Sequence, residues 1–589
     1  MARKSSNRRQ RYIDSEIGGV FQKKKGKIDV VLIYPNTYSV GMSNLGFQTV
    51  YRLLNEMDAV SCERAFLPDF DENAEREVRT VETNRLITEF DVIAFSVSFE
   101  SDFLNLIAVV EKAGLPLQSA ARGDPHPLVI AGGVACFLNP EPVAPFVDCF
   151  LIGEAEQLLP RFIDALDLSS GKQDFLYRAA CTLPGVYVPE FYTPSYNSDM
   201  TCRALTPNRA DIPKTVRRVF EKEISRTFSC TSILTPNTVF KNTFLMEVSR
   251  GCPHGCRFCS AGYIYRPPRF RSFSTLKQNI DMGKEKSRKI GFMGAAVSDH
   301  PEIGGLCQYA MDKGFSVSFS SLRANAFTPE LISALKKSDI KTVTIAPEAG
   351  SERMRCIINK GITENQIYEA VKMIVQSGIP NLKLYFMIGL PWETTHDIEA
   401  IVTLCKEIKE KFLMESREKK RIGTITVSVN PFVPKPFTPF QWAPMNDVKQ
   451  LNKKIEIIRD GLKKVANVRI QAESPRRAIV QGLLSRGDRR VADILLLAVK
   501  NQGNWSKTFK ETGLDIGFFA NRERSIDEFL PWDFIDHGIR KSFLVKEYNR
   551  AQREETSAPC PMKPCDQCGV CNNGFDFHSI VIPKEKTIF

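Results

Sequence analysis

Three cysteines stand close together near the middle of the chain, at Cys252, Cys256 and Cys259. Their spacing is C-x3-C-x2-C, and they follow an apolar stretch that is typical of a strand. Thiolates are the usual ligands of iron–sulfur clusters, and a loop this short can hold three corners of a cubane. Because no fourth cysteine is local, one iron would stay open for a substrate or cofactor, as a catalytic metal does.

The alternatives for this group are a structural zinc site and core thiols without a ligand. Structural zinc is closed by four ligands, and His254 could supply the fourth. His254 lies between the first two cysteines, however, where coordination would strain the loop. Gly251 and Gly255 allow the backbone to curl around a cluster. We therefore favour an iron–sulfur cluster over zinc.

A second group lies near the end of the chain, at Cys560, Cys565, Cys568 and Cys571, with the spacing C-x4-C-x2-C-x2-C. Four thiolates so close in sequence can close one tetrahedral site, and both zinc and an iron–sulfur cluster accept that ligand set. Grouped cysteines in a reducing compartment indicate metal binding rather than disulfides. We favour zinc in a structural or RNA-docking knuckle and keep an auxiliary [4Fe–4S] cluster as the alternative.

The composition is that of a soluble globular protein. Of the 589 residues, 43% are hydrophobic and 25% are charged, which excludes a mainly disordered chain, a collagen-like fibre and a small disulfide scaffold. No apolar run approaches the roughly 18 residues of a membrane-spanning helix, and the N-terminal charges are not followed by the apolar core of a secretory signal. We expect a cytoplasmic protein that does not contact membranes.

The net charge of +12 is concentrated at the N-terminus. Residues 1–27 contain nine Lys or Arg and two Asp or Glu, which together contribute +7. A basic arm of this kind can contact nucleic acid electrostatically. Short basic termini are common and unspecific, so we favour a solvated, disordered tail.

Residues 28–165 alternate short apolar runs with stretches of helical spacing, which predicts a parallel sheet with crossover helices in a Rossmann-like domain. Strands are expected at 29–34, 91–99, 127–131 and 148–152, and a helix at 47–55. Ligands of such folds bind beyond the carboxyl ends of the strands. The loops expected there are 35–46, 96–102, 132–142 and 153–156.

After an irregular connector at 166–240, the strand–helix alternation returns at 241–445. Six strands are expected, at 243–248, 290–293, 316–320, 341–346, 382–388 and 424–429. Six units fit a partial (β/α)6 barrel better than a closed eightfold one. Residues 446–550 are expected to form a helical extension and 551–589 a Cys-rich metal-binding tail. The predicted fold class is α/β, with a Rossmann-like domain, a partial barrel and this C-terminal extension.

The first cysteine group, with the aromatic Phe258 before its last cysteine, resembles the radical S-adenosylmethionine (SAM) superfamily. The resemblance implies that Cys252, Cys256 and Cys259 hold a [4Fe–4S] cluster, whose fourth iron is chelated by the amino and carboxylate groups of SAM. It also implies an electron donor such as flavodoxin or ferredoxin. Reduction then cleaves SAM to methionine and a 5′-deoxyadenosyl radical, which abstracts hydrogen.

Further segments match the superfamily in the expected order. Residues 292–296 correspond to the strand end at the SAM amino group, although the usual acidic residue is missing. Residues 346–351 correspond to the segment that positions ribose and carboxylate, residues 385–393 to the adenine-binding segment, and residues 431–442 to a strand end of cobalamin-type and methylthio-transferring members. No general base is identified. The SAM-binding residues that the resemblance implies are Phe258, Gly294, Ser321, Arg323, Glu348 and Gly389.

Residues 132–142, with Asp148 and 153–156, resemble the cobalamin-binding-type domain that precedes many radical SAM cores. Such domains with a histidine ligand carry D-x-H-x-x-G after the first strand, but the loop at 34–46 has no histidine. His126 lies before a later strand and is interpreted as a loop residue. Cobalamin, if bound, is therefore expected in the base-off form without a protein histidine ligand. The whole order of motifs resembles a group of uncharacterised bacterial radical SAM proteins of the B12 type, which implies no particular substrate.

Three hypotheses follow. The first is a radical SAM enzyme that methylates or similarly modifies an unactivated carbon, with RNA or a nucleotide-like molecule as substrate. The second is a radical SAM enzyme that transfers sulfur or a methylthio group and uses the C-terminal cluster as sulfur source. The third is a non-enzymatic iron–sulfur factor that binds RNA or senses redox state. A basic element at 474–478 and 484–490 could line a substrate channel or be a solvated helix face in which Asp488 pairs with an arginine.

Overall fold

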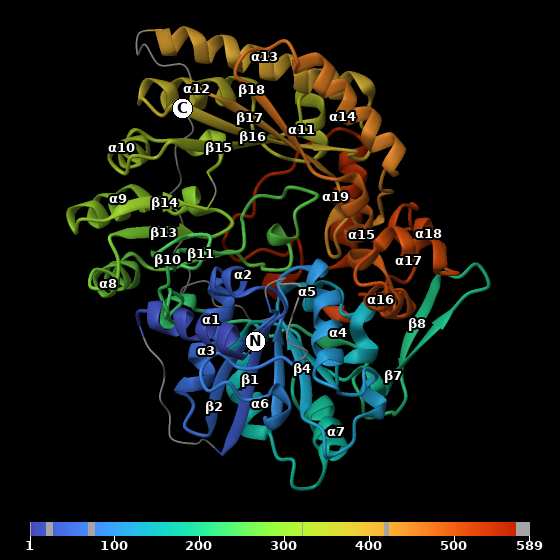
Figure 1. Ribbon diagram of the computed structural model, residues 1–589. Coiled ribbons are helices and arrows are strands. Elements are labelled where there is room, and N and C mark those ends of the chain that lie inside the picture. Colours follow the sequence, from blue (N-terminus) through green and yellow to red (C-terminus); the bar gives the residue numbers. More distant parts are fainter. Residues whose placement is uncertain (1, 19–26, 69–76, 321, 418–422, 573–589) are drawn as a thin grey trace.

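The computed structural model describes residues 2–18, 27–68, 77–320, 322–417 and 423–572. Figure 1 shows the N-terminal sheet and its helices at one end of the molecule and the strands of the second half at the other, with C-terminal segments packed against both. Within the described residues, no helix is both long and apolar enough to cross a membrane.

The N-terminal domain is built on a six-stranded sheet with the order β2-β1-β3-β4-β5-β6. Neighbouring strands are parallel, except that β6 runs antiparallel to β5. The order reverses between β1 and β3, and ligands of parallel sheets bind at such a point. The strands are β1 (Ile28–Tyr34), β2 (Val60–Phe66), β3 (Val92–Ser96), β4 (Leu128–Gly132), β5 (Cys149–Leu151) and β6 (Val186–Tyr187).

Helices cover this sheet because their apolar residues recur at helical spacing. In α3 (Leu45–Glu56), for example, Phe47, Tyr51 and Leu54 are all buried. The four strands and the helix that the sequence predicts here are confirmed. The other helices of the domain are α2 (Tyr38–Met42), α4 (Phe103–Lys112), α5 (Val134–Leu138), α6 (Ala155–Ala165) and α7 (Lys172–Thr182).

Strand β2 was not predicted, because it carries charged residues that are nonetheless buried. Arg64 is 1% exposed and forms ion pairs with Glu16 at 2.8 Å and Glu82 at 2.6 Å. Buried charges persist only when they are paired in this way. A buried strand with charged residues lacks the apolar run by which strands are predicted from sequence.

The N-terminal arm differs from the disordered tail that we favoured. Residues Ala2–Ser15 form helix α1, and the end of this helix docks on the sheet domain. The Tyr12 ring stacks on the Tyr38 ring with centroids 3.9 Å apart, and Arg9 donates a hydrogen bond to the Val81 carbonyl at 2.9 Å. Aromatic stacking and the Glu16–Arg64 pair thus anchor the arm.

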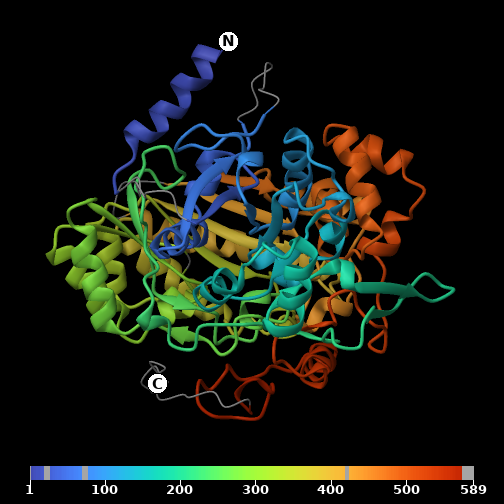
Figure 2. The ribbon, with the colours of Figure 1, turned by 90° about the horizontal axis from the view of Figure 1, so that it is seen from below.

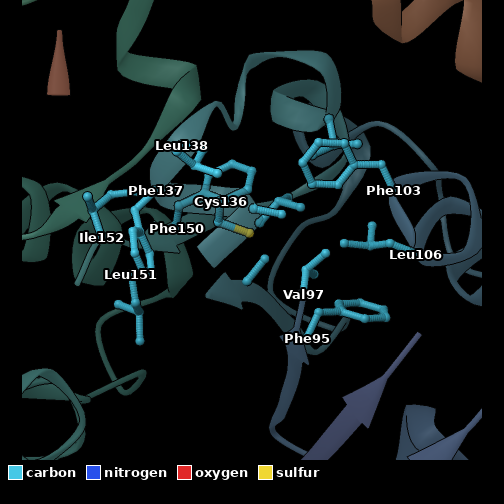
Figure 3. Close-up of a cluster of buried hydrophobic side chains, with 14 of the residues drawn as sticks. Phe95, Val97, Phe103, Leu106, Cys136, Phe137, Leu138, Phe150, Leu151 and Ile152 are labelled. Carbon is cyan, nitrogen blue, oxygen red and sulfur yellow. The ribbon is translucent and has the colours of Figure 1, made fainter. Parts of the chain in front are cut away.

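Apolar side chains from the sheet and its helices form one core. Figure 3 shows a part of it, in which side chains of β3, α4, α5 and β5 surround Cys136. Cys136 is fully buried, as expected of a cysteine that packs as a small apolar residue. The same core continues into C-terminal helices, through residues such as Leu483 and Leu495.

The second half of the chain forms two parallel sheets. One has the order β10-β13-β14 and the other β15-β16-β17-β18. All six strands predicted for the barrel are confirmed. The strands are β10 (Thr243–Glu247), β13 (Lys289–Met293), β14 (Ser316–Phe319), β15 (Thr342–Glu348), β16 (Asn381–Ile388), β17 (Ile425–Pro431) and β18 (Val468–Ala472).

Strand β18 was missed, because it lies at 468–472, in the extension that was predicted to be mainly helical. It is an edge strand in which Arg469 and Gln471 are exposed, so it lacks the apolar run of its neighbours. The helices that alternate with these strands are α8 (Phe273–Gly283), α9 (Ile303–Asp312), α10 (Pro329–Lys337), α11 (Glu352–Ile357), α12 (Glu364–Gln376), α13 (Thr395–Arg417) and α14 (Val448–Leu462).

The remaining elements tie the two halves together. In the connector, β7 (Tyr192–Tyr196) and β8 (Cys202–Pro207) form an antiparallel hairpin, and β9 (Val216–Arg217) pairs with β19 (Ile535–Asp536) of the extension. Two short strands, β11 (Ser249–Arg250) and β12 (Arg269–Phe270), pair next to β10. The C-terminal helices are α15 (Pro475–Arg486), α16 (Val491–Lys500), α17 (Trp505–Glu511), α18 (Ile516–Ala520) and α19 (Lys541–Gln552).

Of the basic element at 474–478 and 484–490, the second part is mostly internal, whereas Arg476 and Arg477 of the first part are exposed. Arg486 is fully buried and donates to the Ala520 carbonyl at 2.6 Å, and Arg489 pairs with Glu141 at 3.1 Å. The pairing of Asp488 with an arginine is confirmed by Arg490 at 2.6 Å. A fully solvated face is wrong for residues 484–490, because they pack between the extension and the N-terminal domain.

Candidate functional site

The first cysteine loop, residues 252–259, begins directly after β10 and β11. Gly251 has φ +80°, and a Cβ at this position would lie 2.8 Å from the Tyr265 carbonyl oxygen. Only glycine satisfies both the left-handed conformation and this close approach. The glycine therefore fixes how the chain enters the loop.

The backbone of this loop is held from several sides. The Gly255 carbonyl accepts hydrogen bonds from Asn359 at 3.1 Å and from the Tyr263 hydroxyl at 3.2 Å. Arg257 is fully buried and donates to the Ile357 carbonyl at 2.9 Å. Two of these bonds join the loop to the end of α11 and the residues after it, so the position of the thiols depends on a segment about 100 residues further along the chain.

The three thiols lie in a common environment. Burial, followed by the neighbouring thiols, raises the pKa of Cys252 to about 12, and burial and Cys256 raise the pKa of Cys259 to about 11. Thiolates in such a place require a compensating cation. Three thiolates supplied by one short loop are a donor set of iron–sulfur clusters, so these residues fit such a cluster.

His254, the residue considered as a fourth zinc ligand, has another partner. Its Nε2 atom lies 3.0 Å from Asp299. The imidazole is thus turned to the 3-10 turn at Val297–Asp299, which agrees with our preference for an iron–sulfur cluster over zinc.

A charged group lies beside the first cysteine loop. Glu348, at the end of β15, forms an ion pair with Lys360 at 3.1 Å, and Arg323 donates to the Lys360 carbonyl at 2.6 Å. Burial alone lowers the pKa of Lys360, but Glu348 and Cys256 raise it above its usual value. Two of the predicted SAM contacts, Arg323 and Glu348, are therefore neighbours. Lys360 was missed, because no motif marks it and only the fold brings it here.

The other predicted SAM contacts differ in their surroundings. Gly294 follows β13, and a Cβ there would lie 2.5 Å from the Ser249 hydroxyl oxygen. Gly389 has φ +78°, and its amide already donates to Glu393 at 2.7 Å. Phe258 packs against the large apolar core. Ser321 lies outside the described residues. None of these contacts with SAM is tested by the structure, so they stay predictions.

The N-terminal domain contains a cavity of about 440 Å³ at the carboxyl ends of its strands. All four loops that the sequence predicts for a ligand contribute to its wall. It extends under α3 and α6, where the lining is apolar, as at Leu54, Leu159 and Phe162. The loop residues in the wall include Asn44, Gly46, Ser96, Ser98, Phe99, Gly132, Gly133, Gly153 and Glu156.

The rim of this cavity includes three residues that flank the first cysteine loop in the sequence, Glu247, Arg250 and Tyr265. Arg250, two residues before Cys252, forms ion pairs with Glu154 at 2.7 Å, Glu156 at 2.8 Å and Glu247 at 2.9 Å. Figure 1 shows β10 and β11 next to the N-terminal domain. One arginine therefore connects the wall of the cavity to the loop.

The carboxylates of this rim are strongly biased towards the charged form. Burial raises the pKa of Glu247, but Arg250 and Arg271 lower it to about 2. Burial likewise raises the pKa of Glu154, but Arg269 and Arg250 outweigh it and bring the pKa of this carboxyl far below its usual range. The rim thus stays ionised at neutral pH. This rim was not predicted, because Glu154 and Arg250 are 96 residues apart.

The second cysteine group, Cys560, Cys565, Cys568 and Cys571, lies against the first loop. The Cys560 amide donates to the Pro253 carbonyl at 2.7 Å. Burial, then Cys565 and Cys568, raise the pKa of Cys571 to about 12, so these thiols also share one environment. This neighbourhood of the two cysteine groups was not foreseen.

Two family models match the chain. One, described as "Radical SAM proteins, N-terminal", matches residues 46–189, and the other, described as "Radical SAM superfamily", matches residues 246–405. The first match covers most of the sheet domain with its cavity, and the second begins in β10 and includes the first cysteine loop.

Relatives and solved structures extend the comparison. An uncharacterised protein of Methanocaldococcus jannaschii is 30% identical over 522 residues, which cover 88% of this chain and 99% of that protein. An uncharacterised methyltransferase of Pyrococcus horikoshii is 28% identical over 170 residues, 28% of this chain and 37% of that protein. The radical SAM methyltransferase TsrM of Kitasatospora setae, with cobalamin and a [4Fe–4S] cluster bound, matches at 11% identity and a TM-score of 0.48 over 81% of this chain and 100% of that chain.

Proposed function

This chain belongs to the radical SAM superfamily, and from that premise we propose that it is a cobalamin-using enzyme that methylates an unactivated carbon. The observation that carries the proposal is the cavity of about 440 Å³, whose wall includes Arg250 and Tyr265 on either side of the first cysteine loop. A cavity at the switch point of a parallel sheet is where such a domain binds its ligand.

The shape of the cavity suits a ligand with a polar head and a flat, apolar tail. Its mouth is lined by loops with small or polar residues such as Gly133 and Ser98, and its interior by apolar side chains under α3 and α6. No histidine is among the residues of its wall. We propose that cobalamin binds base-off, with its nucleotide tail under α3 and α6 and its ring at the loops.

The residues of the chain position these groups. When bound, the [4Fe–4S] cluster, SAM and cobalamin supply the redox and methyl-transfer chemistry. We propose that Cys252, Cys256 and Cys259 hold the cluster and that the charged group of Arg323, Glu348 and Lys360 orients the amino and carboxylate groups of SAM. The ionised rim around Arg250 then holds the two sites in a fixed relation, because its carboxylates come from the sheet domain and from β10.

A substrate with phosphates, RNA or a nucleotide-like molecule, is our proposal for the acceptor. The support is charge, since Arg476 and Arg477 at the start of α15 are exposed and the first 27 residues carry +7. Filter binding of RNA to the R476Q/R477Q variant and to the wild type tests it, and equal affinity in low salt contradicts it.

The second candidate is sulfur or methylthio transfer, with the C-terminal cysteines as sulfur source. The specific observation in its favour is the contact of Cys560 with Pro253. The mass of the modified product distinguishes the two candidates, because a methylthio group adds sulfur and a methyl group does not.

The test uses full-length protein, reconstituted without oxygen. Cobalamin binding is measured by its absorbance spectrum after gel filtration, and 5′-deoxyadenosine is quantified after addition of SAM and dithionite. We expect one cobalamin per chain, a base-off spectrum and 5′-deoxyadenosine that disappears in Cys256→Ala. Protein with a full cluster that retains no cobalamin contradicts the proposal.

A further inference from the structure

We propose that Cys560, Cys565, Cys568 and Cys571 hold a second iron–sulfur cluster, which passes electrons to the cluster of the first cysteine loop. The inference rests on the proposed function for its electron acceptor. It starts from the hydrogen bond of 2.7 Å between the Cys560 amide and the Pro253 carbonyl, which joins a ligand of one site to the loop of the other.

The path of the chain shows that this contact is built into the fold. Arg257 in the first loop pairs with Glu547 of α19 at 3.2 Å, and Ser557 donates to Glu547 at 2.7 Å. The Ser557 amide also donates to Asn359 at 2.9 Å, the residue that binds the Gly255 carbonyl. The segment from α19 to Cys560 thus contacts the first loop directly at Arg257 and Pro253, and a third time through Asn359. Figure 2 shows this red segment at one edge of the molecule.

The second cysteine group has a buried side and an exposed side. Cys568 is 3% exposed, whereas Lys563 and Asp566 between the cysteines are exposed. Cys256 in the first loop is also buried. The group thus lies between solvent, where a donor protein docks, and the first loop, where the electron is used.

The surroundings suit a redox centre. Met562 and Phe270 pack together beside Cys560 and Cys571 and exclude water. The buried Arg266 guanidinium interacts with Cys560 and Cys568 and is held by the Gly262 carbonyl at 2.7 Å. A cation next to a cluster stabilises its reduced form, which carries one more negative charge than the oxidised form.

The transfer is a relay of single electrons. A reduced flavodoxin or ferredoxin gives one electron to the second cluster, which gives it to the first and returns to its oxidised state. No atom is transferred and no bond is formed or broken in either step. The first cluster ends one electron more reduced and the donor protein one electron more oxidised.

The first experiment identifies the metal and does not depend on SAM chemistry. The full-length C252A/C256A/C259A variant lacks the ligands of the first cluster. After anaerobic reconstitution, we expect this variant to retain iron and sulfide in equal amounts and to show a reducible cluster by electron paramagnetic resonance. Zinc in place of iron overturns the proposal. If the wild type forms no 5′-deoxyadenosine, this result contradicts only the proposed function, because the metal analysis does not depend on SAM cleavage.

The second experiment tests the relay. Reduction of the first cluster by flavodoxin hydroquinone is followed by stopped-flow bleaching of its visible absorbance, in the wild type, in Cys568→Ala and in the control Cys181→Ala, a partly exposed cysteine outside both groups. With flavodoxin, we expect the rate of reduction to fall at least tenfold in Cys568→Ala and to stay unchanged in Cys181→Ala. With the small reductant dithionite, the rate in Cys568→Ala should equal that of the wild type. An equal fall with both reductants indicates a structural role, and an unchanged flavodoxin rate excludes a relay. Both results overturn the proposal.

Discussion

The cavity of the sheet domain and the first cysteine loop are shaped by different forces. The cavity is bounded mainly by apolar side chains on α3, α6 and the strands, so its size depends on side-chain volume. The loop has almost no choice of backbone, because Gly251 enters it at φ +80° and Gly255 and Arg257 are bound to distant segments. Substitutions in the loop should therefore abolish cluster binding, whereas substitutions in the cavity wall should change the affinity for the ligand gradually.

The charged groups that join the two regions follow the same contrast. At the rim, Arg250 is surrounded by three carboxylates whose ion pairs span both domains. Beside the loop, one ion pair between Glu348 and Lys360 is close to Cys256. A paired buried charge is expensive to break on one side only. The junction therefore tolerates less variation than the apolar cavity that it borders.

Removal of one loop thiol is expected to have the largest effect. Cys256→Ala leaves two ligands for the first cluster, and we expect 5′-deoxyadenosine formation to fall below detection. The iron bound by the second cysteine group should remain. Cys307→Ala, at a buried cysteine of α9 outside both cysteine groups, is the matched control and should keep the activity. Turnover in Cys256→Ala would show that the loop does not hold the catalytic cluster.

Gly251→Ala tests whether the backbone alone sets the loop. Alanine at φ +80° costs about 1–2 kcal/mol in conformation, and its Cβ would also meet the Tyr265 carbonyl oxygen at 2.8 Å. We expect the iron content of the first loop to fall several-fold. Iron and sulfide analysis, in the background of a C-terminal cysteine variant, measures it.

Gly378→Ala is the control for that experiment, because Gly378 has φ +89° but no atom within 4 Å of its Cβ position. It carries the conformational cost without the clash and should keep its cluster. Equal losses in the two variants would mean that general instability, not the close approach to Tyr265, empties the loop.

The contrast also explains what could be predicted from the sequence. The six barrel strands and the cysteine spacing are local signals, carried by buried apolar runs and by thiols within a few residues. Strand β2 was not predicted because two of its buried residues, Glu63 and Arg64, are charged. Edge strand β18 escaped because its side chains alternate between partly buried and exposed.

The parts of the candidate site that were missed depend on contacts between distant residues. Lys360 reaches Glu348 only because the chain returns after α11, and Arg250 meets Glu154 from 96 residues away. Cys560 and Pro253 are farther apart still in the sequence. Residue type and spacing identify the ligands of a cofactor, but the groups that orient it are assembled by packing.

A substitution in the cavity wall should weaken cobalamin binding without abolishing it. Leu159→Phe adds volume to an apolar wall beneath α6, where space exists and little strain arises. We expect the dissociation constant for cobalamin to rise about tenfold, which corresponds to about 1.4 kcal/mol, with iron content unchanged. Leu168→Phe, three residues after the end of α6 and outside the cavity wall, is the control. Unchanged affinity in Leu159→Phe would show that the bound molecule does not reach under the helices.

The smallest expected effect comes from Asp102, in one of the loops beside the cavity. Burial raises the pKa of Asp102 from 3.8 to about 6, although Asn36 and Asn105 act against it. A raised carboxyl pKa means that the folded state favours the protonated form, so this contribution to stability is present at low pH and is lost as the pH rises towards and through 6. Relative to pH 8, the group should stabilise the fold at pH 5 by about 1–1.5 kcal/mol.

Asp102→Asn removes this dependence and keeps an oxygen for the bond from Asn36, which is 2.9 Å long. Urea unfolding of wild type and variant at pH 5 and pH 8 measures this dependence. The free energy of unfolding of the variant should rise relative to that of the wild type as the pH rises. Asp527→Asn, at an exposed carboxylate, controls for the loss of one negative charge. If the difference between Asp102→Asn and wild type is the same at both pH values, the carboxyl group does not titrate in this range. The loops at the cavity mouth would then be as fixed in charge as the rim around Arg250, and the contrast between the two regions would lie in their packing alone.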